Sequence, residues 1–185
     1  MNTYCYSWPS EISTEHCDAI KSLFFEGKTK DAQIGNVANI DKSVRSSNIL
    51  PCEFNSENSK YLNRIIGQYI TIANRECFGF QLNGYQEFQV AKYSKNDFYD
   101  YHMDSNVYDN ASQRKLSITV QLSDSIDYVG GDFEFSKDIG KLDQKKLREK
   151  GTILVFPSFL YHRITKVTKG ERFSLVGWFE GPDWL

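Results

Sequence analysis

The sequence of 185 residues lacks both a long apolar run and a strong net charge of either sign. Its longest apolar stretch, residues 152–161, contains a proline and falls well short of the roughly 20 residues that span a bilayer. The formal net charge of −2 gives no electrostatic reason to expect nucleic-acid or membrane partners. The opening MNTYCYSWPSEIS has neither the basic nor the apolar region of a signal peptide. We therefore expect a soluble, cytoplasmic protein that binds neither nucleic acid nor membranes.

Cysteine and histidine are scarce, with four and three residues respectively. No CxxC pair occurs among Cys5, Cys17, Cys52 and Cys77, which argues against a zinc site and for reduced, mostly buried thiols. The sequence also has no internal repeat and no low-complexity linker. Its length suits one domain with a real core, so we expect a single domain over residues 1–185.

Residues 1–85 carry two helical patterns. One follows Ser13, a typical N-cap residue, has apolar residues at helical spacing over residues 17–24, and ends at Gly27. The other, over residues 59–79, forms one apolar stripe of Leu62, Ile65, Ile66, Tyr69, Ile70 and Ala73. We expect this N-terminal region to support the rest of the domain.

Residues 86–181 are rich in short strand patterns. Alternating, β-branched or glycine-bounded runs occur at residues 88–93, 115–123, 130–136, 151–157 and 171–181. Many short strands separated by turns are typical of an antiparallel sandwich or jelly roll. The sequence thus predicts a mainly β protein with flanking α-helices, in which the N-terminal helices cover one face of a sheet.

Residues 137–150, between two of these strands, are dense in charge. A charge run of this kind is typical of a solvated surface, and it has none of the interleaved aromatic residues with which nucleic-acid sites stack on bases. We therefore expect a solvated helical hairpin here.

The stretch YDYHMDSN, residues 99–106, holds His102 and Asp104 two positions apart. In an extended segment such residues point to the same face, so the imidazole and the carboxylate would lie side by side. On its own the pair is compatible with a surface ion pair, a core histidine with its hydrogen-bond partner, or two arms of a metal site. The remaining histidines are His16, expected on a helix surface, and His162 at the start of an extended run.

His162 and Arg172 extend this pair into an ordered set on strands or strand ends. Two imidazoles and one carboxylate leave three adjacent positions of an octahedral ion free, which is the facial triad of non-haem Fe(II) oxygenases. A guanidinium can meet the far carboxylate of a chelating dicarboxylate co-substrate with two parallel hydrogen bonds. A buried arginine without an acidic partner is rare, so an inward-pointing Arg172 would require an anion.

Three blocks also resemble one family in order and spacing: QVAKYSKNDFYDYHMD (89–104), RKLSITVQLSDSIDYVGGDFEF (114–135) and GTILVFPSFLYHRITKVTKGERFSLVGWF (151–179). They are similar to the prolyl-hydroxylase-like branch of the 2-oxoglutarate- and Fe(II)-dependent dioxygenases, above all to the small hydroxylases called PKHD-type. The resemblance covers residues 86–181 and implies a dioxygenase core with the fold of a double-stranded β-helix. This fold is a jelly roll with helices outside, in agreement with the strand pattern.

The resemblance implies a role for each residue of the set. His102, Asp104 and His162 would bind iron, and Arg172 would bind the C5 carboxylate of 2-oxoglutarate. Tyr93 matches a family tyrosine that contacts the co-substrate, and Gln89 shares its face by strand phase. Gln121 and Thr119 match pocket positions and are also expected to contact the co-substrate. The remaining positions would line the pocket or its mouth, and they are Tyr99, Phe133, Ile164 and Trp178.

Four further positions bear on these roles. Arg114 opens a strand and is predicted to form a salt bridge rather than to contact a substrate. Arg45 resembles an early arginine–serine segment of the family and is predicted near the mouth of the site. Residues 94–97 lack the glycine that the family often has in this turn, and Gln121 replaces a frequent tyrosine. These departures concern the substrate and leave the iron ligands untouched.

The implied reaction uses Fe(II), 2-oxoglutarate and O₂ to hydroxylate an unactivated C–H bond, with succinate and CO₂ as co-products and ascorbate as a candidate reductant. The implied substrate is a prolyl residue of a protein or peptide. Two alternatives stay open, namely hydroxylation of a free amino acid or other small molecule, and a jelly-roll binding domain without catalysis. A pocket closed by the 94–98 turn and the 105–113 loop would favour a small molecule, whereas an open groove would favour a peptide. Sheet edges permit a monomer or a homodimer.

Overall fold

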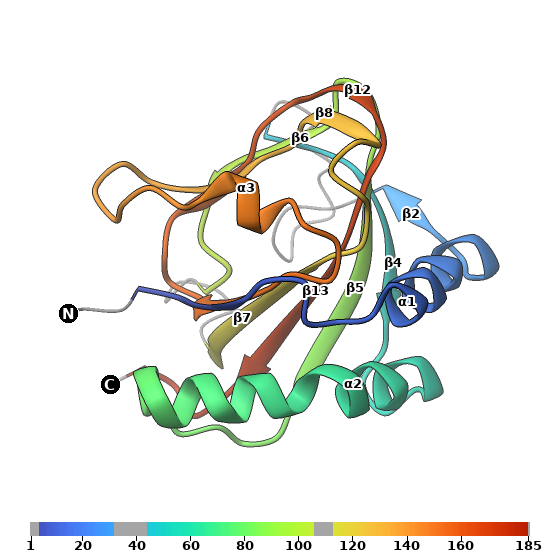
Figure 1. Cartoon of the computed structure of the whole chain (residues 1–185). Helices are drawn as coiled ribbons and strands as arrows, with labels where there is room; N and C mark the ends of the chain where they lie inside the picture. The colour runs from blue at the N-terminus through green and yellow to red at the C-terminus, as the bar shows by residue number, and fades with distance from the viewer. Residues whose placement is uncertain (1–3, 32–43, 106–112, 185) are drawn as a thin grey trace.

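The computed structural model describes residues 4–31, 44–105 and 113–184, which form antiparallel sheets flanked by helices (Figure 1). The large sheet has the order β1 (Tyr6–Trp8), β10 (Ile153–Pro157), β7 (Arg114–Gln121), β13 (Arg172–Glu180), β5 (Gln86–Tyr93), β4 (Asn48–Cys52), β2 (Lys30–Asp31). The small sheet has the order β3 (Arg45–Ser46), β6 (Phe98–His102), β11 (His162–Ile164), β9 (Phe133–Phe135). A two-stranded ladder joins β12 (Val167–Gly170) to β8 (Tyr128–Gly130).

The two predicted helices form where the sequence placed them. α1 (Thr14–Glu26) begins after Ser13, whose hydroxyl accepts the His16 backbone N–H, and it ends at Gly27. α2 (Glu57–Ala73) continues into a π-helical turn, η1 (Asn74–Phe78). None of the helices in the described ranges is long and apolar enough to cross a membrane.

Strand alternation divides the buried side chains into two cores. Phe173, Leu175 and Phe179 of β13 point to the side of the sheet that α1 and α2 cover. They belong to the same core as Leu62 and Ile66 of α2. The opposite face of the large sheet packs against the small sheet around a second core of Ile49, Ala91, Tyr93, Phe133, Phe135, Leu154, Phe156, Ile164 and Val167. Residues two apart on one strand share a face, so this second face is the one that can carry a site between the sheets. The prediction of a mainly β protein with helices on one sheet face is confirmed.

The N-terminal region does more than support the sheets. It contributes β1, β2 and β4 to the large sheet and β3 to the small one. The pairing of β4 with β5 covers residues 48–52, and that of β3 with β6 joins Arg45 to Tyr99. The boundary at residue 85 and the single domain stay predictions.

The expectation of a helical hairpin at residues 137–150 is wrong. The segment forms turns and one short helix, α3 (Gln144–Leu147). Arg148, which follows α3, is directed inward, with only 20% of its side chain exposed. Charge density alone therefore did not reveal that Arg148 and Lys150 of this run are largely covered by the rest of the protein.

Candidate metal centre and adjoining cavity

The neighbouring residues His102 and Asp104 meet His162, which lies far along the sequence, between the sheets. His102 ends β6, Asp104 follows it, and His162 begins β11, where it is the register partner of His102. His102 Nε2 lies 3.5 Å from Asp104 Oδ1, and His162 Nε2 lies 3.6 Å from Asp104 Oδ2. The three ligand atoms lie within 4.8 Å of one another. The pairing of β6 with β11 thus assembles the predicted set.

Each histidine is oriented by the backbone in the same way. Nδ1 of His102 donates to the carbonyl of Asp100 at 2.8 Å, and Nδ1 of His162 donates to the carbonyl of Leu160 at 2.8 Å. A carbonyl only accepts, so the proton must be on Nδ1. The lone pair of Nε2 is then free to bind a metal, as is usual for metal-bound histidines.

Asp104 is fixed by two serines. Its Oδ2 accepts a hydrogen bond from Ser117 Oγ at 2.6 Å, and its backbone N–H donates to the carbonyl of Ser158 at 2.9 Å. We did not predict either serine, although Ser117 precedes Thr119 by two residues on β7, so strand phase places both on one face. The pair holds the carboxylate toward the histidines.

Electrostatics favours the metal-binding protonation states. Burial opposes ionisation of Asp104, but the histidines and the Ser117 hydroxyl outweigh it, so the pKa of Asp104 falls below its usual range. Burial lowers the pKa of His162 to about 4, with a smaller contribution from His102. An ionised Asp104 carboxylate and a neutral His162 imidazole are the forms in which these two groups bind a divalent ion.

These donors fit iron. Adjacent ligand atoms around an octahedral ion lie about 3 Å apart when each bond is about 2.1 Å, close to the separations of 3.5 and 3.6 Å. Two nitrogens and one oxygen on one side of the ion leave the opposite side open to other ligands. The chemistry of the donor set therefore matches a non-haem Fe(II) site.

A cavity adjoins the three ligands. Most of the residues predicted for the pocket line it, namely Gln89, Tyr93, Tyr99, Thr119, Phe133, Ile164 and Trp178. Among the described residues, the wall of the cavity also contains Arg45, which was expected near the mouth of the site. Four lining residues were not predicted, namely Ile118, Phe156, Ser174 and Val176. Their roles stay predictions, but the shared cavity places them beside the metal ligands.

Arg172 lies behind this cavity wall, on the face of β13 that carries Ser174 and Val176. Its Nη1 donates to Ser174 Oγ at 3.3 Å, and its guanidinium carbon lies 5.7 Å from the Tyr93 ring centroid. The residue is 4% exposed and has no carboxylate partner within the described ranges. A guanidinium has five N–H donors, so this buried cation keeps hydrogen-bonding capacity for an anion. The surroundings of Arg172 therefore fit a carboxylate of a bound co-substrate.

Gln121 requires a correction. Its side-chain amide donates to the carbonyl of Ser123 at 3.0 Å and to the hydroxyl of Tyr128 at 2.9 Å. Both amide hydrogens are thus used, and Gln121 is not among the described residues lining the cavity. The sequence could not show that Tyr128, seven residues later, folds back onto Gln121.

A stack of three side chains closes another part of the cavity. The Tyr99 ring lies 3.4 Å from the His102 ring, and the Arg45 guanidinium lies 4.3 Å from the Tyr99 ring. Burial raises the pKa of Tyr99 to about 12, so its phenol stays neutral. Arg45 is 6% exposed and its one hydrogen bond within the described ranges goes to Ser47 Oγ. The cavity therefore has a second buried guanidinium besides Arg172.

Two further polar groups lie near the ligands. Arg114 forms the predicted salt bridge, with 2.6 Å between its Nη2 and Glu87 Oε2. Its guanidinium carbon also lies 4.1 Å from the Trp178 ring. The Trp178 indole N–H is buried without an acceptor in the described part of the chain. A buried donor without a partner is costly, so this cavity wall can favour a ligand that brings an acceptor.

Comparison with known proteins agrees with this site. The family model of the 2OG-Fe(II) oxygenase superfamily matches residues 88–180. A PKHD-type hydroxylase of Synechococcus sp. is 40% identical over 93 residues, covering 50% of this chain and 41% of that protein. A PKHD-type hydroxylase of Idiomarina loihiensis is 31% identical over 91 residues, covering 49% and 40%. The chain thus spans about two fifths of the length of these curated relatives.

Solved structures share the fold. A Pseudomonas putida prolyl-4-hydroxylase superposes with a TM-score of 0.73 at 17% identity, covering 97% of this chain and 93% of that one. A Trichoplax adhaerens prolyl hydroxylase in complex with a hypoxia-inducible-factor peptide gives 0.74 at 16%, covering 96% and 83%. These likenesses confirm the predicted jelly roll. With its matched family model and its His-Asp-His site, the chain belongs to the 2OG-Fe(II) oxygenase superfamily.

Proposed function

We propose that this protein is an Fe(II)- and 2-oxoglutarate-dependent hydroxylase. The observation that carries the proposal is the meeting of His102, Asp104 and His162 beside a cavity backed by Arg172, a buried cation without a carboxylate partner in the described ranges. The three ligands would hold the iron on one side. Arg172, with Ser174 and Tyr93 beside it, would bind the far carboxylate of 2-oxoglutarate.

The bound iron and 2-oxoglutarate would supply the oxidation, and the residues of the protein would position these groups. Iron and 2-oxoglutarate, when bound, supply the oxidation of an unactivated C–H bond by O₂, with succinate and CO₂ as co-products. The chain itself orients both histidines through backbone carbonyls and holds the Asp104 carboxylate through the Ser117 hydroxyl. Apolar side chains of Phe133, Phe156, Ile164 and Trp178 line the cavity and limit the access of water.

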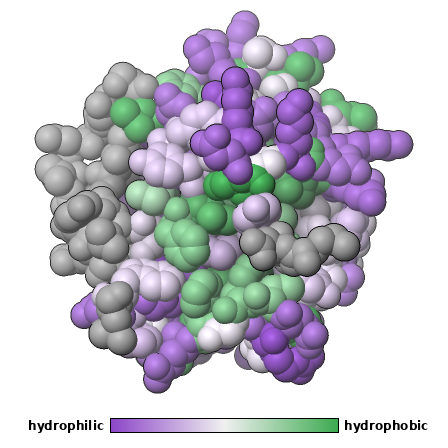
Figure 2. Space-filling view, turned by 90° about the vertical axis from the view of Figure 1, so that its left-hand side faces the viewer, coloured by the Kyte–Doolittle hydropathy of each residue, from purple (hydrophilic) through white to green (hydrophobic). Residues whose placement is uncertain are grey.

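A prolyl residue of a protein or peptide is the substrate we favour. The prolyl hydroxylases that share the fold support it, one of them solved with a peptide. Apolar side chains also lie exposed beside the metal ligands in the sequence, with Met103 36%, Phe159 44% and Tyr161 48% exposed. Figure 2 shows hydrophobic residues gathered across the centre of one face of the molecule. Exposed apolar side chains of this kind can receive a peptide.

Arg45 gives a reason to keep a free amino acid or other small acid as a second candidate. Its buried guanidinium lines the cavity without a carboxylate partner in the described ranges, so it could receive a substrate carboxylate. The turn expected to close over a small substrate is described, but residues 106–112 of the 105–113 loop lie outside the described residues. A binding domain without catalysis is disfavoured by the intact ligand set.

The first test is a substrate screen. The protein with Fe(II), 2-oxoglutarate and ascorbate would be incubated with proline-containing peptides and with free amino acids. We expect succinate formation to rise with a proline-containing peptide, together with a mass gain of one oxygen atom on the proline. A gain on free amino acids alone would select the second candidate. No succinate above the level of a His102→Ala control would contradict an enzyme.

A second prediction uses Arg45 to distinguish the substrate classes. Arg45→Met keeps the apolar stem and removes the charge. If Arg45 donates to a peptide carbonyl, the substrate KM should rise about tenfold, and if it pairs with a substrate carboxylate, about 100-fold or more. The 2-oxoglutarate KM should stay within about twofold, because Arg172 binds that co-substrate.

Arg75→Met is the matched control for Arg45→Met. Arg75 pairs with Glu76 and its side chain is 70% exposed, so its loss should leave both KM values unchanged. An Arg45→Met variant that matches this control in substrate KM would remove Arg45 from the substrate site.

A further inference from the structure

Residues 128–133 connect the co-substrate side of the cavity to the metal side. Gly131 lies against Arg172, since a methyl group built on Gly131 would be 3.1 Å from Arg172 Cδ. Phe133 lines the cavity, and its ring centroid lies 5.3 Å from that of His162. The position of this short segment therefore bears on both groups.

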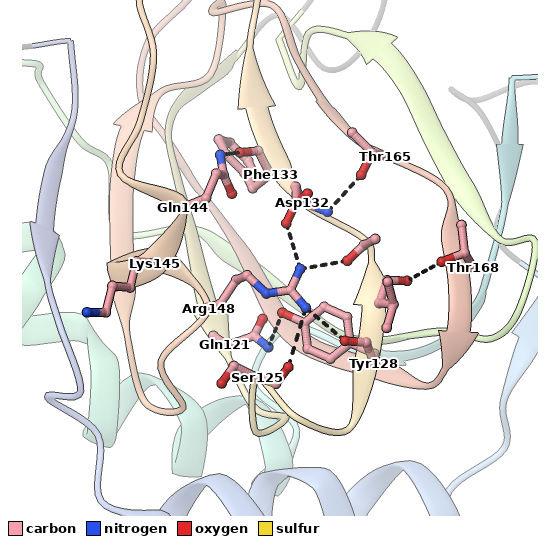
Figure 3. Close-up of polar contacts among 12 residues, drawn as sticks. Gln121, Ser125, Tyr128, Asp132, Phe133, Gln144, Lys145, Arg148, Thr165 and Thr168 are labelled. Carbon is pink, nitrogen blue, oxygen red and sulfur yellow. Dashed lines mark hydrogen bonds and ion pairs between the residues drawn. The ribbon is translucent and has the colours of Figure 1, made fainter.

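Arg148 holds this segment from outside the cavity (Figure 3). Its Nη1 donates to the carbonyl of Gly130 at 2.8 Å and pairs with Asp132 Oδ1 at 2.6 Å. Its Nη2 donates to the carbonyl of Tyr128 at 2.8 Å, and the guanidinium carbon lies 4.2 Å from the Tyr128 ring. The planar guanidinium thus contacts every second residue of the segment, namely 128, 130 and 132. The single ammonium group of a flexible lysine could not hold all three in one geometry.

Further side chains also hold this segment. Gln144 of α3 donates to the carbonyl of Phe133 at 2.7 Å. On the opposite side, the Asp132 backbone N–H donates to Thr165 Oγ1 at 2.8 Å, and Thr168 Oγ1 donates to the carbonyl of Val129 at 3.2 Å. The charged stretch 137–150 is therefore one of two walls between which the segment is held.

We propose that Arg148 is a positioning residue for Arg172, and through it for the carboxylate of 2-oxoglutarate. This inference rests on the proposed function. Gly130 and Gly131 both have left-handed backbone, with φ of 76° and 66°, so the segment turns sharply where it meets Arg172. Without Arg148, the carbonyls of Ser125, Tyr128 and Gly130 and the carboxylate of Asp132 lose this donor, so the turn is held less firmly. A small shift of Gly131 would let the Arg172 side chain move, because Gly131 packs against it. Displacements of this size weaken the binding of a ligand to a preorganised site.

The test compares Arg148→Met with Lys150→Met. Lys150 lies in the same charged stretch and pairs with Asp18 at 2.6 Å and Asp124 at 3.6 Å, away from residues 128–133. Calorimetric titrations would measure Mn(II) binding first, as a redox-stable substitute for Fe(II), and 2-oxoglutarate binding to the Mn(II)-loaded protein second. Hydrogen exchange of the metal-free protein would follow the amides of residues 128–133 and 172–174.

Arg148→Met is expected to raise the Kd of 2-oxoglutarate about tenfold. Its Mn(II) affinity should stay within about twofold, and exchange should rise in both segments. Lys150→Met should leave both affinities unchanged. A parallel loss of Mn(II) and 2-oxoglutarate affinity would assign Arg148 a merely structural role, and an unchanged Kd for 2-oxoglutarate would refute the positioning role.

A second variant covers the case in which Arg148→Met does not fold, and the parent protein separates failure of this inference from failure of the proposed function. Arg148→Lys keeps the charge without the planar guanidinium, so it should show the same selective loss if Arg148→Met does not fold. If the parent protein binds 2-oxoglutarate and the variant binds it equally well, only the positioning inference fails. If the parent protein itself binds no 2-oxoglutarate, the proposed function fails and this inference fails with it.

Discussion

His102→Ala is expected to lose Fe(II) binding by at least about 100-fold, and with it all hydroxylation. The substitution removes one of the three ligand atoms that lie within 4.8 Å of one another, whereas removal of a mere partner of a ligand already costs about 10- to 100-fold. Under anaerobic conditions the parent protein with Fe(II) and 2-oxoglutarate should develop a visible charge-transfer band. The variant should not.

The chain supplies its own control for this prediction in His16. It lies on α1, where its Nδ1 is 3.2 Å from Ser13 Oγ, far in sequence from the metal ligands. His16→Ala removes the same side chain and should keep the band and the iron affinity. A band of full intensity in His102→Ala would show that the ion binds elsewhere, and no band in the parent protein would end the enzyme proposal.

Arg172→Met is expected to weaken 2-oxoglutarate binding by at least about 30-fold while Fe(II) affinity stays within about twofold. Loss of one partner from a buried, hydrogen-bonded charge pair costs about 2–5 kcal/mol, and each 1.4 kcal/mol is tenfold in Kd. Arg172 is 4% exposed and is not a metal ligand, so the two affinities should separate. Titration of the metal-loaded variant with 2-oxoglutarate measures the effect.

The stability of Arg172→Met gives an independent check. In the ligand-free protein the buried cation has Ser174 as its one hydrogen-bond partner within the described ranges. Replacing it with an apolar side chain should therefore leave the free energy of unfolding unchanged or raise it, as measured by urea denaturation. A large loss of stability together with unchanged 2-oxoglutarate affinity would make Arg172 a structural residue instead.

The candidate ligand set could be predicted because His102 and Asp104 are two residues apart in a strand pattern, and His162 and Arg172 follow them in order on further strand patterns. In the structure β6 ends at His102, and Asp104 lies just beyond it. The family resemblance assigned Tyr93 to the co-substrate and Trp178 to the pocket, and both line the cavity, while their roles stay predictions. Helix caps and apolar stripes predicted α1 and α2, because both signals are local in the sequence.

Other parts of the site depend on pairings that no local pattern contains. Arg45 reaches the cavity because β3 pairs with β6. Ser117 of β7 reaches Asp104 although the two residues are on different segments. Gln121 was assigned to the co-substrate by the family resemblance, yet its amide donates to the Tyr128 hydroxyl. The position of a residue on a strand indicates the face to which its side chain points. It does not indicate which neighbouring group that side chain will contact.

The sequence alone determined the order of the ligands, the strand-rich core and the two supporting helices, since spacing and periodicity are properties of consecutive residues. Only the tertiary structure decided which buried charges have partners. Arg148 in a charged run donates to Tyr128, Gly130 and Asp132, whereas the one hydrogen-bond partner of Arg172 among the described residues is the Ser174 hydroxyl. Both are arginines beside charged or polar residues in the sequence. The difference arises from segments brought together by sheet register, and register is set by packing across the whole fold.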